Sequence, residues 1–121
     1  MEVDIEICLN SVERAEVTLF ANQFLIKCTS NDASGDLLNI IVRLEDDDRI
    51  GRVDHIVRDF LRYLAPYSNT IRRYQGVLRL GVFYNLEETV IFPFQLSCEA
   101  IKSIADLNLS IDATGYPCSP E

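Results

Sequence analysis

The sequence predicts one α+β domain, with a single antiparallel sheet of about six or seven strands and two helices packed on one face. Three observations support this prediction. Several segments alternate apolar and polar residues, as strands with one wet face do. The segment 50–64 repeats its apolar residues with helical periodicity instead. The length of 121 residues is typical of one domain with one core.

The segment 1–48 is expected to be rich in strands. Residues 2–9 predict a strand, because apolar and acidic side chains alternate there without a break. Residues 15–28 favour a hairpin, but a helix capped by Ser11 also fits residues 11–22, and the two alternatives stay open. After a turn-rich loop, residues 38–44 alternate again as a further strand.

The segment 49–113 predicts the order helix, strand, strand, helix, strand. The first helix is expected to end near Ala65, because Pro66 pushes the residue before it out of helical geometry. Phe60 lies at the centre of its apolar arc. Residues 76–85 and 89–96 read as two strands, and Pro93 places the second at an edge or a bulge.

The second helix is expected to begin after Ser97, whose hydroxyl oxygen can accept a hydrogen bond from a free amide of the first turn. Asn108 follows its last turn, where a residue that tolerates left-handed geometry is common. Residues 109–113 then predict a last short strand, and residues 114–121 a loose tail.

Charge is distributed unevenly along the chain. Residues 1–48 contain eleven acidic and three basic side chains, a net charge of −8, whereas residues 49–121 contain eight of each. The whole imbalance therefore lies in the first segment, a pattern that bears on partners rather than on fold. Nucleic acid is not expected as a ligand, because phosphate binding needs a basic surface.

The composition favours a cytoplasmic protein without a membrane segment. No apolar run approaches the length of a membrane span, and the first residues are acidic where a signal peptide would be basic. The four cysteines are widely spaced, which predicts reduced thiols that act mostly as small core residues rather than a zinc site. No metal and no cofactor is expected.

The stretch LEDDDR, residues 44–49, places four carboxylates side by side. A calcium loop needs alternating oxygens and a central glycine, which this stretch lacks. One of the aspartates could cap the helix that follows. Helix capping accounts for one or two of these carboxylates. The others, together with the acidic stripe of residues 2–6, are expected to bind a partner. The candidate partner-binding residues are Glu2, Asp4, Glu6, Glu45, Asp46, Asp47 and Asp48.

No catalytic residue is predicted, and the chain is not expected to be an enzyme. His55, the only histidine, falls on the helix face opposite the apolar arc and should point to solvent. The basic run IRRY, residues 71–74, reads as a solvated loop. None of the familiar nucleophile, metal or phosphate-loop motifs is present.

The second half of the sequence resembles a known type of domain. The segment LSCEAIKSIADLN followed by a strand that runs into Tyr116 is similar to the end of an uncharacterised family of small bacterial domains. The wider pattern, a short acidic α+β domain without a catalytic motif, resembles the immunity proteins of polymorphic toxin systems, including contact-dependent growth inhibition. Such proteins bind a basic toxin domain and block its active site.

This resemblance leads to one expected function and one alternative. The expected function is that of an immunity protein, a monomer whose acidic residues meet the basic cleft of a toxin, most readily a nuclease. The alternative is an acidic secretion chaperone, which would show a large exposed apolar patch and form a homodimer.

Overall fold

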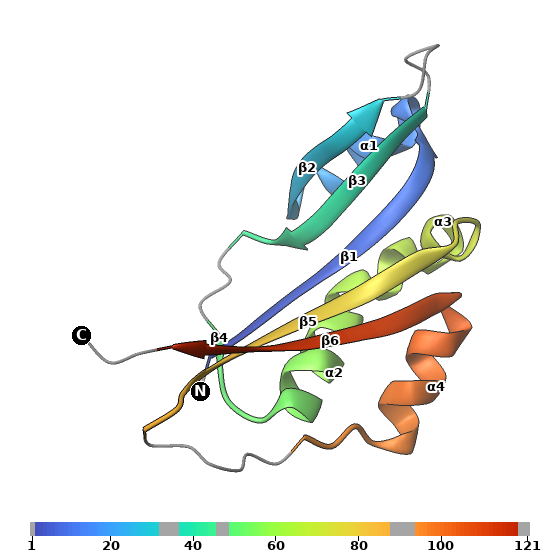
Figure 1. Cartoon of the computed structure of the whole chain (residues 1–121). Coiled ribbons are helices and arrows are strands. Elements are labelled where there is room, and N and C mark those ends of the chain that lie inside the picture. The colour runs from blue at the N-terminus through green and yellow to red at the C-terminus, as the bar shows by residue number, and fades with distance from the viewer. Residues whose placement is uncertain (1, 32–36, 46–48, 88–93, 119–121) are drawn as a thin grey trace.

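The structure is a computed structural model and describes residues 2–31, 37–45, 49–87 and 94–118. One twisted sheet forms one layer of the protein, and the helices form a second layer on one of its faces (Figure 1). The predicted α+β class, with a single sheet and helices on one face, is confirmed. Among the described residues, no helix is long and apolar enough to cross a membrane.

The sheet has the strand order β2-β3-β1-β5-β6, and the short β4 also pairs with β1. Its strands are β1 (Glu2–Glu13), β2 (Phe24–Asn31), β3 (Leu37–Leu44), β4 (Arg49–Ile50), β5 (Gly76–Asn85) and β6 (Leu109–Cys118). β1 lies at the centre and runs antiparallel to both β3 and β5. The N-terminal and C-terminal halves of the chain therefore share one sheet.

The sheet is mixed, so the expectation of a wholly antiparallel sheet is wrong. β6 runs parallel to β5 over ten consecutive residue pairs, from Gly76 opposite Leu109 to Asn85 opposite Cys118. The connection between the two strands contains helix α4 (Cys98–Asp106). A connection of this length can cross over the sheet and return the chain in the same direction, which a short turn cannot do. The same pairing extends the last strand to Cys118, well beyond the predicted end at residue 113.

Helix α2 (Val53–Leu64) is the main cover of the sheet. Phe60, Val57 and Leu64 are completely buried, so the predicted apolar arc is confirmed from Val53 on. Ile50, which the helical periodicity included, lies in β4 instead and is 77% exposed. The helix ends where it was expected to end, because Pro66 starts a short 3-10 turn, η1 (Ala65–Tyr67). The core between the helices and the sheet has 25 buried apolar residues and contains no buried polar or charged residue among those described.

Residues 14–20 form a helix, α1 (Arg14–Phe20), which settles the alternative that the sequence left open. Ser11 does not cap it; this residue lies in β1, at a register irregularity, with a positive φ of 56°. Phe20 explains the helix, because it is fully buried with its ring 5.3 Å from that of Tyr67. This packing outweighs the strand preference of the β-branched Thr18, whose hydroxyl donates to the Ala15 carbonyl oxygen at 2.9 Å.

Helix α4 begins and ends as the sequence predicted. The Ser97 hydroxyl oxygen accepts a hydrogen bond from the Ala100 amide at 3.1 Å, so Ser97 is the N-cap. Asn108 has a φ of 61°, the left-handed geometry expected after the last turn. The preceding strand predicted at 89–96 lies mostly outside the described residues, and residues 94–97 are not in a strand.

Two further sequence-based expectations are wrong. The run IRRY was expected to be a loop, but its first residues belong to helix α3 (Ser68–Arg72), and Ile71 is completely buried. The cysteines are free, but they are not core residues, since Cys8 is half-buried and the other three are exposed. Cys8 lies on the polar side of β1, between the buried Ile7 and Leu9, because side chains alternate between the two faces of a strand. The number and spacing of the cysteines do not show this.

Candidate functional site: the open face of the sheet

One face of the sheet carries none of the helices that the described residues form, and we call it the open face. In β1, the residues Val3, Ile5, Ile7 and Leu9 face the core and are at most 1% exposed. Their neighbours along the strand point to the open face. Residues that pair on neighbouring strands point to the same face, so the strand register shows which residues of β2, β3, β5 and β6 lie on the open face. The charged residues on the open face of the paired strands include Glu2, Asp4, Glu6, Lys27, Arg43, Arg79 and Asp112.

The acidic stripe of β1 lies on the open face, but two of its three carboxylates have arginine partners. Glu6 lies opposite Arg43 on one side and opposite Arg79 on the other. Asp4 accepts a hydrogen bond from Arg43 at 2.8 Å, and Glu6 is 3.5 Å from Arg79. Cross-strand pairs of opposite charge stabilise a sheet. The sequence-based inference that this stripe has no stabilising role is therefore wrong for these two residues.

Arg79 is held by two neighbours on β1. Its guanidinium donates to the Cys8 sulfur at 3.4 Å, and it also faces Glu6. The contact with Cys8 and the charge of Glu6 raise the pKa of Arg79, so its positive charge is secure at every physiological pH. The centre of the open face is therefore a matched set of charges rather than a purely acidic surface.

A shallow hollow of about 140 Å³ is lined in part by Asp4, Glu6 and Arg79 and extends from β1 across β5 to β6. Gly81 forms its floor, and a Cβ atom at this position would lie 3.2 Å from the Tyr116 ring. The rings of Phe83 and Tyr116 stack at a centroid distance of 5.0 Å and form one wall. Asp112 also lines the hollow and makes no ion pair or side-chain hydrogen bond with any described residue. Carboxylates beside aromatic faces are suited to a cationic side chain.

Only the first carboxylate of the LEDDDR stretch can be placed. Glu45 is exposed at the end of β3, and Asp46, Asp47 and Asp48 lie outside the described residues. The hypothesis that an aspartate of this stretch caps the next helix is wrong. β4 comes first, and the N-cap of α2 is Arg52, which makes no side-chain capping hydrogen bond. The acidic residue in the first turn is Asp54 instead.

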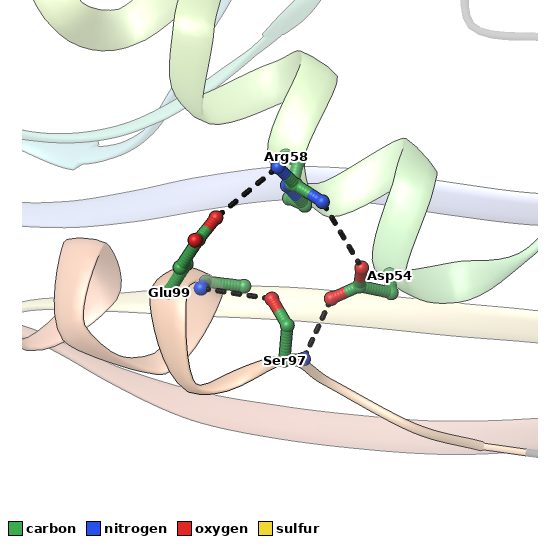
Figure 2. A network of polar contacts seen from close by, with 5 residues as sticks. Asp54, Arg58, Ser97 and Glu99 are labelled. Atoms are coloured by element: carbon green, nitrogen blue, oxygen red, sulfur yellow. Dashed lines mark hydrogen bonds and ion pairs between the residues drawn. The ribbon is translucent and has the colours of Figure 1, made fainter.

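A second polar cluster joins the beginnings of α2 and α4 (Figure 2). Asp54 accepts a hydrogen bond from the Ser97 amide at 2.7 Å. Arg58 lies 3.9 Å from Asp54 and donates to Glu99 at 3.2 Å. Asp54 and Arg58 are one helical turn apart, a spacing at which opposite charges pair within a helix. The contacts to α4 join residues about forty positions apart, so the sequence alone does not indicate them. This cluster fixes the start of α4 against α2.

A cavity of about 730 Å³ opens next to this cluster and is lined by Arg52, His55, Arg58 and Gln95, among others. His55 is exposed, as the sequence predicted. Among the described residues, no group of three or more histidine, cysteine, aspartate or glutamate side chains is placed to hold a metal ion.

The basic run at 71–74 holds neighbouring helices in place. Arg72 donates to the Asp106 carbonyl oxygen at the end of α4 at 2.8 Å. Arg73 and Tyr74 both contact the Glu16 carboxylate of α1. Burial and the hydrogen bond to Glu16 raise the pKa of Tyr74, so it remains a neutral donor. These arginines therefore satisfy a helix end and a carboxylate.

Comparisons with protein-family models, curated proteins and solved structures give no match for this chain. Function must therefore be inferred from the surfaces described above.

Proposed function

We propose that this protein is an immunity protein that binds a cognate basic toxin domain, most readily a nuclease, and blocks its active site. The observation that supports this proposal best is the uncovered open face in a chain with a net charge of −8. A sheet face without helices offers a broad surface to another protein, and its charged centre gives that surface a specific pattern.

The electrostatic argument concerns capture of the partner. The excess negative charge belongs entirely to residues 1–48, whose strands form the centre and one side of the sheet. Such a field attracts a basic protein over a distance of about 10 Å at moderate salt and increases the rate of encounter. In the complex, carboxylates would occupy positions in a nuclease cleft that normally hold phosphates.

The arginines of the open face would make the proposed binding surface specific for one partner. A wholly acidic face would attract any basic protein, whereas Arg43 and Arg79 repel positive charge at two defined positions. A toxin that presents an acidic group opposite each arginine is accepted, and one that presents a lysine there is rejected. The centre of the face therefore selects a partner, and the surrounding charge attracts it.

The first prediction tests the acidic surface directly. The triple variant Glu45→Gln, Asp46→Asn and Asp47→Asn is expected to associate roughly tenfold more slowly with the cognate toxin and to depend less on salt. The toxin is sought as the C-terminal domain of a large secreted protein encoded beside this chain. Surface capture at two salt concentrations measures the rates, and growth after co-expression measures neutralisation.

A matched control removes the same charge elsewhere. The variant Asp59→Asn, Glu87→Gln and Asp106→Asn takes three carboxylates from the neutral segment and is expected to leave the association rate nearly unchanged. Equal slowing by both variants would show that only net charge matters. An unchanged rate in both would contradict the acidic surface, and binding would then be sought around His55, Arg58 and Arg62.

A further inference from the structure

The two edges of the sheet are protected to different degrees. The outer strand β2 carries Lys27, and its pairing with β3 shifts register between Cys28 and Ser30. Lysines, prolines and bulges are among the means by which an edge strand avoids pairing with another chain. The opposite edge, β6, has no lysine and no register shift in its ten paired residues, and its one proline, Pro117, lies next to the last residue of the strand, so residues 109–116 have none of these devices. Along its outer side it pairs with no described strand.

β6 is also exposed on both of its faces. All of its residues after Leu109 are exposed, including Ile111 at 40% and Tyr116 at 43%. The reason is a difference in length: the nine residues of α4 extend over roughly 13 Å, whereas the ten residues of β6 extend over about 33 Å. Figure 1 shows β6 continuing well past the end of the α4 layer. No described strand therefore pairs with the outer edge of this part of β6, and its residues are exposed on both faces.

We propose that β6 accepts an extended segment of the basic partner as an additional strand, in which lysine or arginine residues alternate with apolar residues. The basic character of this occupant rests on the proposed function; the binding edge rests on the structure. Backbone hydrogen bonds to the free edge would hold the segment, as in other cases of strand addition.

Side chains on β6 define the pattern of the added strand. On the open face, the added strand would lie beside Asp112, Thr114 and Tyr116, where a cationic side chain meets a carboxylate without a described partner and an aromatic ring. On the other face, it would lie beside Ile111 and Ala113, which favour apolar side chains. Since side chains of a strand alternate between the faces, the matching sequence alternates too.

Charge complementarity favours this occupant over a second copy of the chain. Another copy would bring a further net charge of −8 and a second Asp112 to the same edge. A basic segment would instead bring positive charge, which offsets the negative charge of the chain and can pair with Asp112. Homodimerisation through β6 is therefore an outcome that would contradict the proposal.

The experiment uses the full chain and a short capped peptide in which lysine and valine alternate, so it does not depend on identifying the toxin. Amide NMR spectra and hydrogen exchange are expected to show binding at millimolar or lower concentration, with protection confined to residues 109–118. A peptide of the same composition with its lysines grouped at one end is the control. Equal binding of that control, protection along β2, or no binding would overturn the proposal.

Two N-methylated forms of the peptide sharpen this test. An added strand donates hydrogen bonds to β6 from the amide groups of every second residue only. One peptide therefore carries methyl groups on its odd-numbered nitrogens and the other on its even-numbered nitrogens, and only one of the two should lose binding. If both methylated peptides bind, or if neither binds, no regular strand is added.

Variants locate the site on the protein. Asp112→Asn is expected to weaken binding of the peptide about two- to fivefold, the range for an exposed ion pair. Ile111→Lys should abolish it, and circular dichroism checks that the fold survives. The matched control is Leu25→Lys on β2, a residue of similar exposure at 46%, which should bind normally. Normal binding by Ile111→Lys would contradict the site. A failure of toxin neutralisation would leave these results unaffected and would refute the proposed function alone.

Discussion

The two faces of the central strand β1 differ in what they do for the protein. On the covered face, four aliphatic side chains are at most 1% exposed and pack under the helices. On the open face, Asp4 and Glu6 pair with arginines of neighbouring strands and stay partly exposed, with side-chain exposures of 36% and 16%. Burial of apolar area supplies most of the folding free energy, whereas exposed ion pairs supply little. The comparison predicts that substitutions on the open face threaten the fold much less than substitutions on the covered face.

The largest expected effect lies under the covered face. Phe60 is completely buried in α2 with its ring 6.4 Å from that of Phe24 in β2, so Phe60→Ala leaves a cavity between the two layers. The free energy of unfolding should fall by roughly 3–5 kcal/mol, as is typical of this truncation. Urea titration monitored by circular dichroism measures it. A loss below about 1 kcal/mol would mean that the helix layer contributes little to stability.

An intermediate effect is expected at the junction of α2 and α4. Ser97→Ala removes the hydroxyl oxygen that accepts from the Ala100 amide, and should cost about 0.5–2 kcal/mol of unfolding free energy. Ser97→Gly is a matched control that should cost less, because glycine is tolerated at this position. If alanine and glycine behave alike, the hydroxyl does not act as a cap. Thermal unfolding of both variants provides the measurement.

The smallest effect on stability is expected on the open face. The double variant Asp4→Asn and Glu6→Gln should change the unfolding free energy by less than about 1 kcal/mol, because the Asp4 and Arg43 side chains are each 36% exposed. Toxin binding by the same variant should weaken clearly, since Arg43 and Arg79 lose their partners and add uncompensated positive charge. A stability loss as large as that of Phe60→Ala would remove the distinction between the two faces.

Local patterns in the sequence were sufficient for the elements with one clear periodicity. Alternation predicted β1, β3 and β5, helical spacing predicted α2, and single residues such as Pro66, Ser97 and Asn108 marked helix ends correctly. α1 could not be predicted, because what favours it is the packing of Phe20 against Tyr67, 47 positions away. The parallel direction of β6 likewise depends on the route of the chain after β5.

The candidate site was predictable in part. Alternation placed Glu2, Asp4 and Glu6 on one face correctly, but their neighbours depend on strand order and register. Arg43 and Arg79 approach Glu6 only because β1 lies between β3 and β5. Asp112 and Tyr116 could not be recognised either, because their place at the hollow depends on the parallel pairing of β6 with β5, and Tyr116 also lies beyond the predicted end of the strand.

The central place of β1 has a consequence for the chain while it is being made. β1 is synthesised long before β5, so one of its edges stays unpaired until residue 85 is available. An alternating apolar strand in that condition pairs readily with other copies of itself. Glu2, Asp4 and Glu6 repel such copies, as charged gatekeeper residues do in other proteins. The carboxylates that we propose face a partner in the finished protein would thus also keep nascent chains apart until Arg79 has been synthesised.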